Sequence, residues 1–352
     1  MFLAVAALSA TANANITFQD NRLVLSVAGK QVVSSPAEGL WSVATGWSDD
    51  WMCDWHHASP ERIECSGEWS IAHGKIILAG GELRLRDSYR QIESGLVQCV
   101  RRYEWHGEEP LEKVTLSVRF AVEGQQLMPC LPGILYYGNK NGAKVNSNII
   151  PVYNGTAGEF AIFEEHRYPM PFAMLESAAG GYAAALHTVP SPVRGAMLAD
   201  QWWSMGVEAH DGYSEIILYS GPIGYNGQHS VAKALQKRPM RYADTYITLE
   251  PGQIIEKSFY LECYPIEREG TGFQQPLYTT LDLYKPYDAE RFATFEQIVR
   301  GKYEFAKKRW IEFDDTAVGF NMYDTSLRKD IVMGWCGQAD SPGFSLQVLG
   351  KM

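Results

Sequence analysis

The chain is poor in basic residues, and this shortage excludes several classes of partner. Its 352 residues include 31 Lys and Arg against 41 Asp and Glu, a formal net charge of −10 at pH 7. Because phosphate binding needs clustered Lys and Arg, this balance argues against nucleic acid or an anionic membrane as the partner. An uncharged ligand such as a neutral sugar fits the composition better.

Motifs for metal and nucleotide binding are also missing from the sequence. The six cysteines form no C-x-x-C pair, so neither a zinc ribbon nor a redox motif is indicated. The absence of G-x-S-x-G, P-loop and G-x-G-x-x-G motifs disfavours a serine hydrolase, an NTPase and a dinucleotide enzyme. We therefore expect no metal and no cofactor. Cys53–Cys65 is a candidate disulfide, and the other cysteines are expected to be buried free thiols.

Long apolar runs are lacking, and no stretch is long enough to span a bilayer. The first residues have an apolar core at Phe2–Leu8 and end in Ala12-Asn13-Ala14, which resembles a cleavage site, although a positive n-region is missing. We interpret residues 1–14 as the remnant of a signal peptide, with an ordinary first strand as the alternative. The expected location is periplasmic or extracellular.

Aromatic residues and strand-like segments, by contrast, are abundant. The chain has 10 Trp, 19 Tyr and 14 Phe, which favour cores and ligand-binding faces alike. Between residues 15 and 264, short apolar-alternating segments recur about every ten residues with turn residues between them. This spacing predicts a mainly β fold, a large antiparallel β-sandwich (supersandwich). Its clearest segments are 97–105, 114–122, 172–177, 182–187, 215–220 and 256–264.

The pattern changes after residue 264. Residues 265–288 are punctuated by Pro and Gly, which predicts a linker. Residues 289–313 carry apolar side chains at three- and four-residue steps, which predicts a long amphipathic helix. A second helix is expected to begin near 342–344. We expect residues 289–352 to be the start of a larger helical domain of which this chain holds only part.

This layout resembles the six-hairpin glycosidase superfamily. The resemblance is carried by the helix Phe292–Trp310 and by the turn Met333–Phe344, MGWCGQADSPGF, which follow the predicted sandwich and linker. It implies that 289–352 begins an α/α toroid. It also implies that loops at the mouths of the inner helices form a sugar pocket, with catalytic carboxylates further into the toroid. No specific family motif matches, so the resemblance assigns no catalytic residue.

The turn at 333–344 offers groups suited to a sugar. Trp335 presents an aromatic face for sugar C–H groups, while Gln338 and Asp340 offer an amide and a carboxylate for hydroxyls. We predict that these three residues bind substrate. The alternative is a capped helix start, with Asp340 or Ser341 capping the helix and Trp335 packing on the sandwich.

Residues 39–62 show neither a strand nor a helix period, and we predict a structured loop there. Within it, Trp51 and Asp54 are candidate sugar contacts. Packing between domains is the alternative. Metal binding by the neighbouring His56 and His57 is disfavoured because adjacent residues of an extended chain point to opposite sides.

A second charged cluster, Glu164-Glu165-His166-Arg167, ends the long irregular stretch 129–171. Glu165 and Arg167 are predicted to reach the substrate pocket. The alternative is a structural Arg–Glu pair with solvated neighbours. Glycoside hydrolysis needs two carboxyls flanking one bond, and adjacent glutamates of one strand face opposite ways, so this pair alone is not that dyad.

Together these features favour the N-terminal part of a secreted glycoside hydrolase acting on oligo- or polysaccharide. Two alternatives remain open. One is a polysaccharide lyase of sandwich-plus-toroid build, which would need a base and a group to neutralise a uronate. The other is a non-catalytic carbohydrate-binding module.

Overall fold

The computed structural model describes residues 14–48, 51–93, 95–139, 152–191, 203–223, 246–284, 293–313, 317–321 and 350–351. The chain divides into two compact units, Met1–Tyr284 and Lys285–Met352. Nearly all of the predicted signal-peptide remnant lies outside the described residues. In the part of the chain that is described, no helix combines the length and apolar character needed to cross a bilayer.

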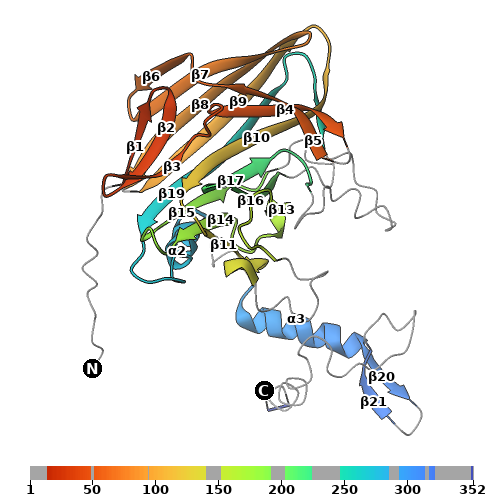
Figure 1. Cartoon of the computed structure of the whole chain (residues 1–352). Coiled ribbons are helices and arrows are strands. Elements are labelled where there is room, and N and C mark those ends of the chain that lie inside the picture. The colour runs from red at the N-terminus through yellow and green to blue at the C-terminus, as the bar shows by residue number, and fades with distance from the viewer. Residues whose placement is uncertain are drawn as a thin grey trace. The chain divides into compact units, whose positions relative to one another are not determined.

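The first unit contains two large antiparallel sheets, which confirms the predicted mainly β sandwich (Figure 1). The ten-stranded sheet has the order β1-β2-β3-β10-β17-β16-β13; β4 and β18 also pair with β10, and β5 pairs with β4. Its strands are β1 (Ala14–Gln19), β2 (Arg22–Val27), β3 (Lys30–Ser34), β4 (Trp41–Ser48), β5 (Trp51–Ala58), β10 (Leu111–Glu123), β13 (Phe160–Glu164), β16 (Ser204–His210), β17 (Tyr213–Tyr219) and β18 (Ile247–Leu249).

The nine-stranded sheet has the order β12-β11-β14-β15-β19-β9-β8-β7-β6. Its strands are β6 (Arg62–Ser66), β7 (Trp69–Leu78), β8 (Gly81–Glu93), β9 (Leu96–Gly107), β11 (Met128–Leu131), β12 (Leu135–Tyr136), β14 (Phe172–Ser177), β15 (Tyr182–Thr188) and β19 (Ile254–Pro265). Short 3-10 turns, η1 (Tyr137–Asn139) and η3 (Glu165–Arg167), follow β12 and β13.

Alternating side chains of both sheets form the main hydrophobic core. On β9, Val97, Cys99, Tyr103 and Trp105 belong to this core, and Arg101 takes the position in the middle of the series. The same alternation on β10 and β17 sends every second residue to the core and leaves the others on the opposite face of the ten-stranded sheet.

A buried ion pair inside the core anchors the start of the β4–β5 hairpin. Arg101 Nη2 lies 2.7 Å from Asp87 Oδ2, and both side chains are almost fully buried. Asp87 also accepts a hydrogen bond from Trp41 Nε1, and Arg101 Nη2 donates to the Leu40 carbonyl. Because a buried charge is tolerated only when it is paired and hydrogen-bonded, this network fixes where β4 enters the sheet.

Two local predictions for the first part of the chain were wrong. Residues 39–62 are not a loop, because 41–48 and 51–58 form the antiparallel hairpin β4–β5. The bridge between Cys53 and Cys65 is not formed: both are free, and they lie on β5 and β6, in different sheets.

The predicted linker contains a helix. Residues 274–284 form α2 (Gln274–Tyr284), which lies within the first unit. Thr279 donates a hydrogen bond to Glu262 on β19, and the Thr280 hydroxyl lies 3.1 Å from His187 Nδ1 on β15. Pro276 sits in the first turn, where the missing N–H costs nothing, so a proline that suggests a linker is compatible with a helix start.

The second unit is described only in part. It contains α3 (Phe295–Lys308), which confirms a helix in this region, and a two-stranded sheet of β20 (Trp310–Phe313) and β21 (Ala317–Phe320). The predicted helix start near 342–344 lies outside the described residues. The assignment of this unit to a toroid stays a prediction.

Candidate functional site

The β4–β5 hairpin lies over the face of the ten-stranded sheet that points away from the main core. A second, smaller apolar cluster forms beneath it, including Ala44 from β4, Met52 from β5 and Ile217 from β17. Trp51 and Trp55 pack against this cluster but remain partly exposed. The hairpin therefore presents two indole rings at the edge of a covered sheet face.

Charged side chains occupy the same face of the sheet. Arg119 on β10 and Glu215 on β17 stand at positions that alternate with core residues, as does Glu208 on β16. In the strand register, Glu208 lies directly opposite Glu215. Arg119 lies opposite Ile217, which is the next residue after Glu215 on the same face of β17. Strand alternation thus gathers three charges beside the tryptophans.

These residues enclose a pocket of about 250 Å³. This is smaller than the roughly 300–1,000 Å³ typical of sites for drug-sized ligands. The Arg119 guanidinium lies over the Trp55 ring at 5.6 Å, and the Trp51 ring stacks on Phe160 at 4.6 Å. The lining residues are Glu38, Trp51, Trp55, His57, Arg119, Glu208 and Tyr219.

Arg119 is held by two carboxylates. Its Nε and Nη2 donate to the two oxygens of Glu215 at 2.7 and 2.9 Å, a bidentate pair in which Glu215 is fully buried. Its Nη1 lies 2.9 Å from Glu38 Oε1 and donates to Ser42 Oγ at 3.2 Å. All three guanidinium nitrogens are therefore engaged by protein groups.

The pKa values of two acidic groups at the pocket are shifted in opposite directions. Burial raises the pKa of Glu208, and the facing Glu215 carboxylate raises it further. Burial alone would also raise the pKa of Glu215, but His210 and Arg119 outweigh it and the pKa lies below its usual value. Two acids whose environments separate their pKa values in this way are a frequent arrangement at sites of proton transfer.

Two histidines complete the surroundings. His57 Nδ1 lies 2.8 Å from Ser42 Oγ, and burial lowers the pKa of His57, so its imidazole is neutral at pH 7. The contact with Glu215 raises the pKa of His210. His210 Nε2 lies 3.8 Å from Glu215 and 3.9 Å from Glu208, between the two carboxyls.

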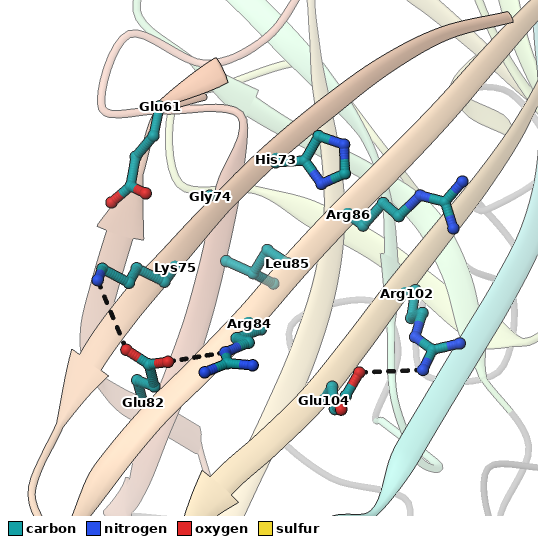
Figure 2. Close-up of a pocket in the computed structure, with 10 residues that line it drawn as sticks. All are labelled: Glu61, His73, Gly74, Lys75, Glu82, Arg84, Leu85, Arg86, Arg102 and Glu104. Carbon is teal, nitrogen blue, oxygen red and sulfur yellow. Dashed lines mark hydrogen bonds and ion pairs between the residues drawn. The ribbon is translucent and has the colours of Figure 1, made fainter. Parts of the chain in front are cut away.

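A second hollow, of about 400 Å³, lies on the outer face of β7, β8 and β9 (Figure 2). Glu82 pairs with Lys75 at 3.6 Å and with Arg84 at 2.7 Å, and Arg102 pairs with Glu104 at 3.0 Å. None of the described residues that line it is a Trp, Tyr or Phe. Exposed ion pairs of this kind contribute little to binding or stability, so we take the pocket beside Trp55 as the candidate site.

Of the predicted substrate-binding residues within the described chain, Trp51 lines this pocket. Asp54 is on the same strand, but its exposed side chain lies against Gly46 and does not line the pocket. Glu165 is fully buried and bonds Lys257 Nζ at 2.6 Å, and Arg167 pairs with Glu164. Trp335, Gln338 and Asp340 lie outside the described residues, so their role stays a prediction.

The sequence interpretation overlooked Glu38, Arg119, Glu208 and Glu215. A signal for the last three was present, because each is a charged residue inside an otherwise apolar strand: SVRFAV, MGVEAH and YSEIIL. A charge at such a position must face away from the core or be paired. Three strands with this feature predict a charged face, although not which strands lie side by side.

No protein-family model matches the chain, and no curated protein sequence matches it. Among solved structures, a candidate aldose 1-epimerase from Escherichia coli K12 matches with a TM-score of 0.43 and 11% identity, over 72% of this chain and 97% of that one. A polysaccharide lyase matches with a TM-score of 0.36 and 12% identity, over 76% of this chain and 34% of that one.

A candidate kojibiose phosphorylase from the human microbiome matches with a TM-score of 0.26 and 9% identity, over 69% of this chain and 24% of that one. These names concern proteins that act on carbohydrates, but every similarity is distant. Membership of the six-hairpin superfamily stays a prediction, and the functional proposal rests on the residues of the pocket.

Proposed function

We propose that the chain is part of a glycoside hydrolase and that the pocket beside Trp55 binds a neutral sugar unit. The observation that carries the proposal is the combination of partly exposed indole rings with carboxyl groups in one small pocket. Sugars present C–H faces that pack on aromatic rings, and hydroxyls that bond to carboxyls. Both kinds of contact are available from Trp51, Trp55, Glu38 and Glu208.

The charges of the pocket favour a sugar without a carboxylate. Among the described lining residues, Arg119 is the only Lys or Arg, and Glu215 and Glu38 already neutralise it. A uronate would therefore meet carboxyls without a free cation to receive it, and like charges at close range cost several kcal/mol. This weakens the lyase alternative, which requires such a cation.

The remaining parts of the proposal concern regions that are not described. We propose that Trp335, Gln338 and Asp340 also bind substrate, on the second unit, and that the protein acts in the periplasm or outside the cell. The leader-like residues 1–14 support the location.

A paired tryptophan substitution tests the sugar site. Trp55→Ala removes an indole ring that lines the pocket and packs against the Arg119 guanidinium. Truncating a central aromatic contact typically costs about 2 kcal/mol, so we expect affinity for neutral oligosaccharides to fall by at least about tenfold in isothermal titration.

Trp69→Ala is the matched control. Trp69 is also a half-buried tryptophan with an arginine, Arg90, over its ring at 4.9 Å, but it lies on β7 in the other sheet. We expect the Trp69 variant to bind like the unaltered protein. Equal loss in both variants, or none in either, would contradict the proposed site.

A further inference from the structure

We propose that Glu208 and Glu38 are the catalytic acid and base of a glycosidic cleavage that takes place in the sandwich pocket itself. The proposal rests on the function proposed above and locates its chemistry in the first unit, rather than in the helical unit. It starts from geometry: both side chains line the pocket beside Trp55, and they come from different elements.

Glu208 lies directly opposite Glu215, so the two glutamates compete for the positive charges of Arg119 and His210. They are direct partners in the antiparallel ladder of β16 and β17 and lie on the same face. Side chains paired in this way stand about 4.5–5.5 Å apart, and two like charges there destabilise the sheet. In such a pair the pKa of one carboxyl is raised.

The surroundings decide which carboxyl is protonated. Glu215 is fully buried and accepts both bonds of the Arg119 fork, and it also lies nearest to His210, so its charge is neutralised in place. Glu208 has no arginine contact, is 25% exposed and opens on the pocket, with the Tyr219 hydroxyl beside it. The raised pKa of Glu208 agrees with this assignment.

Glu38 supplies the complementary carboxylate. Its Oε1 receives Arg119 Nη1 at 2.9 Å, while its side chain is 32% exposed at the pocket. The neutral His57 lies beside it in the lining and adds no charge. Arg119 thus contacts groups on which both proposed catalytic residues depend. It neutralises Glu215, the ladder partner of Glu208, and it orients Glu38 through its Nη1.

The reaction follows from these two groups and a water molecule. Glu208 gives its proton to the oxygen that joins the bound sugar to its neighbour, and the bond from that oxygen to the anomeric carbon breaks. The Glu38 carboxylate takes a proton from water, whose oxygen bonds to the anomeric carbon. Solvent then returns a proton to Glu208 and removes one from Glu38. Acid and base catalysis of this type contributes about 10²–10⁴-fold to the rate.

The test uses the full chain with Glu208→Gln and Glu38→Gln, and Glu104→Gln as the control. Glu104 is also a partly exposed glutamate bonded to an arginine, but it lies in the hollow of Figure 2. Reducing-end release from a neutral oligosaccharide that binds in titration gives kcat. We expect kcat to fall by at least about 100-fold in each pocket variant, and affinity to fall less, because glutamine keeps a hydrogen-bonding group at the same place. The control variant should keep both values.

Leaving-group dependence separates a catalytic acid from a structural glutamate. A dinitrophenyl glycoside releases a weakly basic anion that needs no proton, whereas an alkyl glycoside needs one. Glu208→Gln should therefore slow the alkyl substrate far more than the dinitrophenyl substrate. It should also abolish the decline of kcat/KM at high pH that deprotonation of Glu208 causes in the unaltered enzyme.

Three results would overturn the proposal. One is a normal kcat in either pocket variant, and another is an equal slowing of both glycosides by Glu208→Gln. The third is sugar binding by the unaltered protein without any cleavage. The proposed sugar site fails separately, if no neutral oligosaccharide binds or if binding does not depend on Trp55.

Discussion

Single charged residues placed inside apolar strands give this protein its candidate site. Arg119, Glu208 and Glu215 each replace an apolar residue on the side of a strand that faces away from the main core. Such positions are costly unless the charge is paired, and the pairing found here leaves Glu208 without an arginine partner. A carboxyl of raised pKa beside two indole rings is the consequence.

The free energy of unfolding should depend on pH through the protonation of Glu208. Its pKa is raised in the folded state by burial and by Glu215, so folding favours the protonated form. This contribution is complete below the unfolded pKa of about 4.3 and is lost as pH rises through the folded pKa. Glutamine does not titrate, so the Glu208→Gln variant has no such pH-dependent loss. Its free energy of unfolding should therefore increase relative to that of the unaltered protein as pH rises through the folded pKa of Glu208.

Denaturant unfolding between pH 3 and pH 8 measures this difference. Glu104→Gln provides a control of opposite sign, because a hydrogen bond from Arg102 lowers the pKa of Glu104. The contribution of Glu104 is present above the unfolded pKa and disappears as pH falls through the folded pKa. Parallel curves for Glu208→Gln and the unaltered protein would show that Glu208 is ionised like an ordinary surface glutamate.

At the scale of elements, the β4–β5 hairpin explains both the success and the failure of the sequence interpretation. Strands with one core face, such as β9, show the alternation that predicts them: a strand over 97–105 is predicted, and Leu96–Gly107 is observed. Strand β4 instead contributes Trp41 and Val43 to the main core and Ala44 to the second cluster. The sequence of β4, WSVATGWS, therefore has no two-residue period, and its Ser, Thr and Gly residues interrupt any apolar run that would predict a buried strand.

The site itself could be predicted only in part for the same reason. Trp51 was predicted because tryptophan, aspartate and histidine gather within one short stretch, and it lines the candidate pocket. Glu208 and Arg119 lie far apart in the chain and line one pocket because the strands are in the order β10-β17-β16. The periodicity of the sequence does not predict this order. Glu165 lies in a charged segment typical of a binding site, but its side chain is buried and pairs with Lys257.

The contact between β13 and β16 depends on Gly206. A Cβ at this position would lie 2.0 Å from the Ala161 carbonyl oxygen and 2.7 Å from the Ile162 Cα, both backbone atoms that cannot move independently. We expect Gly206→Ala to lower the free energy of unfolding by about 1–3 kcal/mol, the usual cost of overpacking. Sugar affinity should fall as well, because Glu208 is two residues further along β16.

Gly301→Ala makes the same chemical change in open space. Gly301 lies in α3 with no atom within 4 Å of the added Cβ, and alanine there should stabilise the helix by up to about 1 kcal/mol. Denaturant unfolding and titration of both variants check the prediction. An unchanged stability for Gly206→Ala would mean that β13 and β16 are less closely paired than described.

At the scale of the whole molecule, the described part of the site belongs to the first unit alone. Every lining residue of the pocket lies between Glu38 and Tyr219, and the chain as a whole carries a net charge of −10. Both the pocket and the surrounding protein therefore repel anionic sugars. Selection of a neutral ligand is the central claim that follows.

Titration of the full chain with two oligosaccharides of the same linkage tests this claim most directly. One has hydroxymethyl groups at C6 and the other has carboxylates, so that they differ only at C6, where the second compound is negatively charged. We predict that the neutral compound binds at least about tenfold more tightly, since like charges at close range cost several kcal/mol. Equal or tighter binding of the uronate would contradict the account.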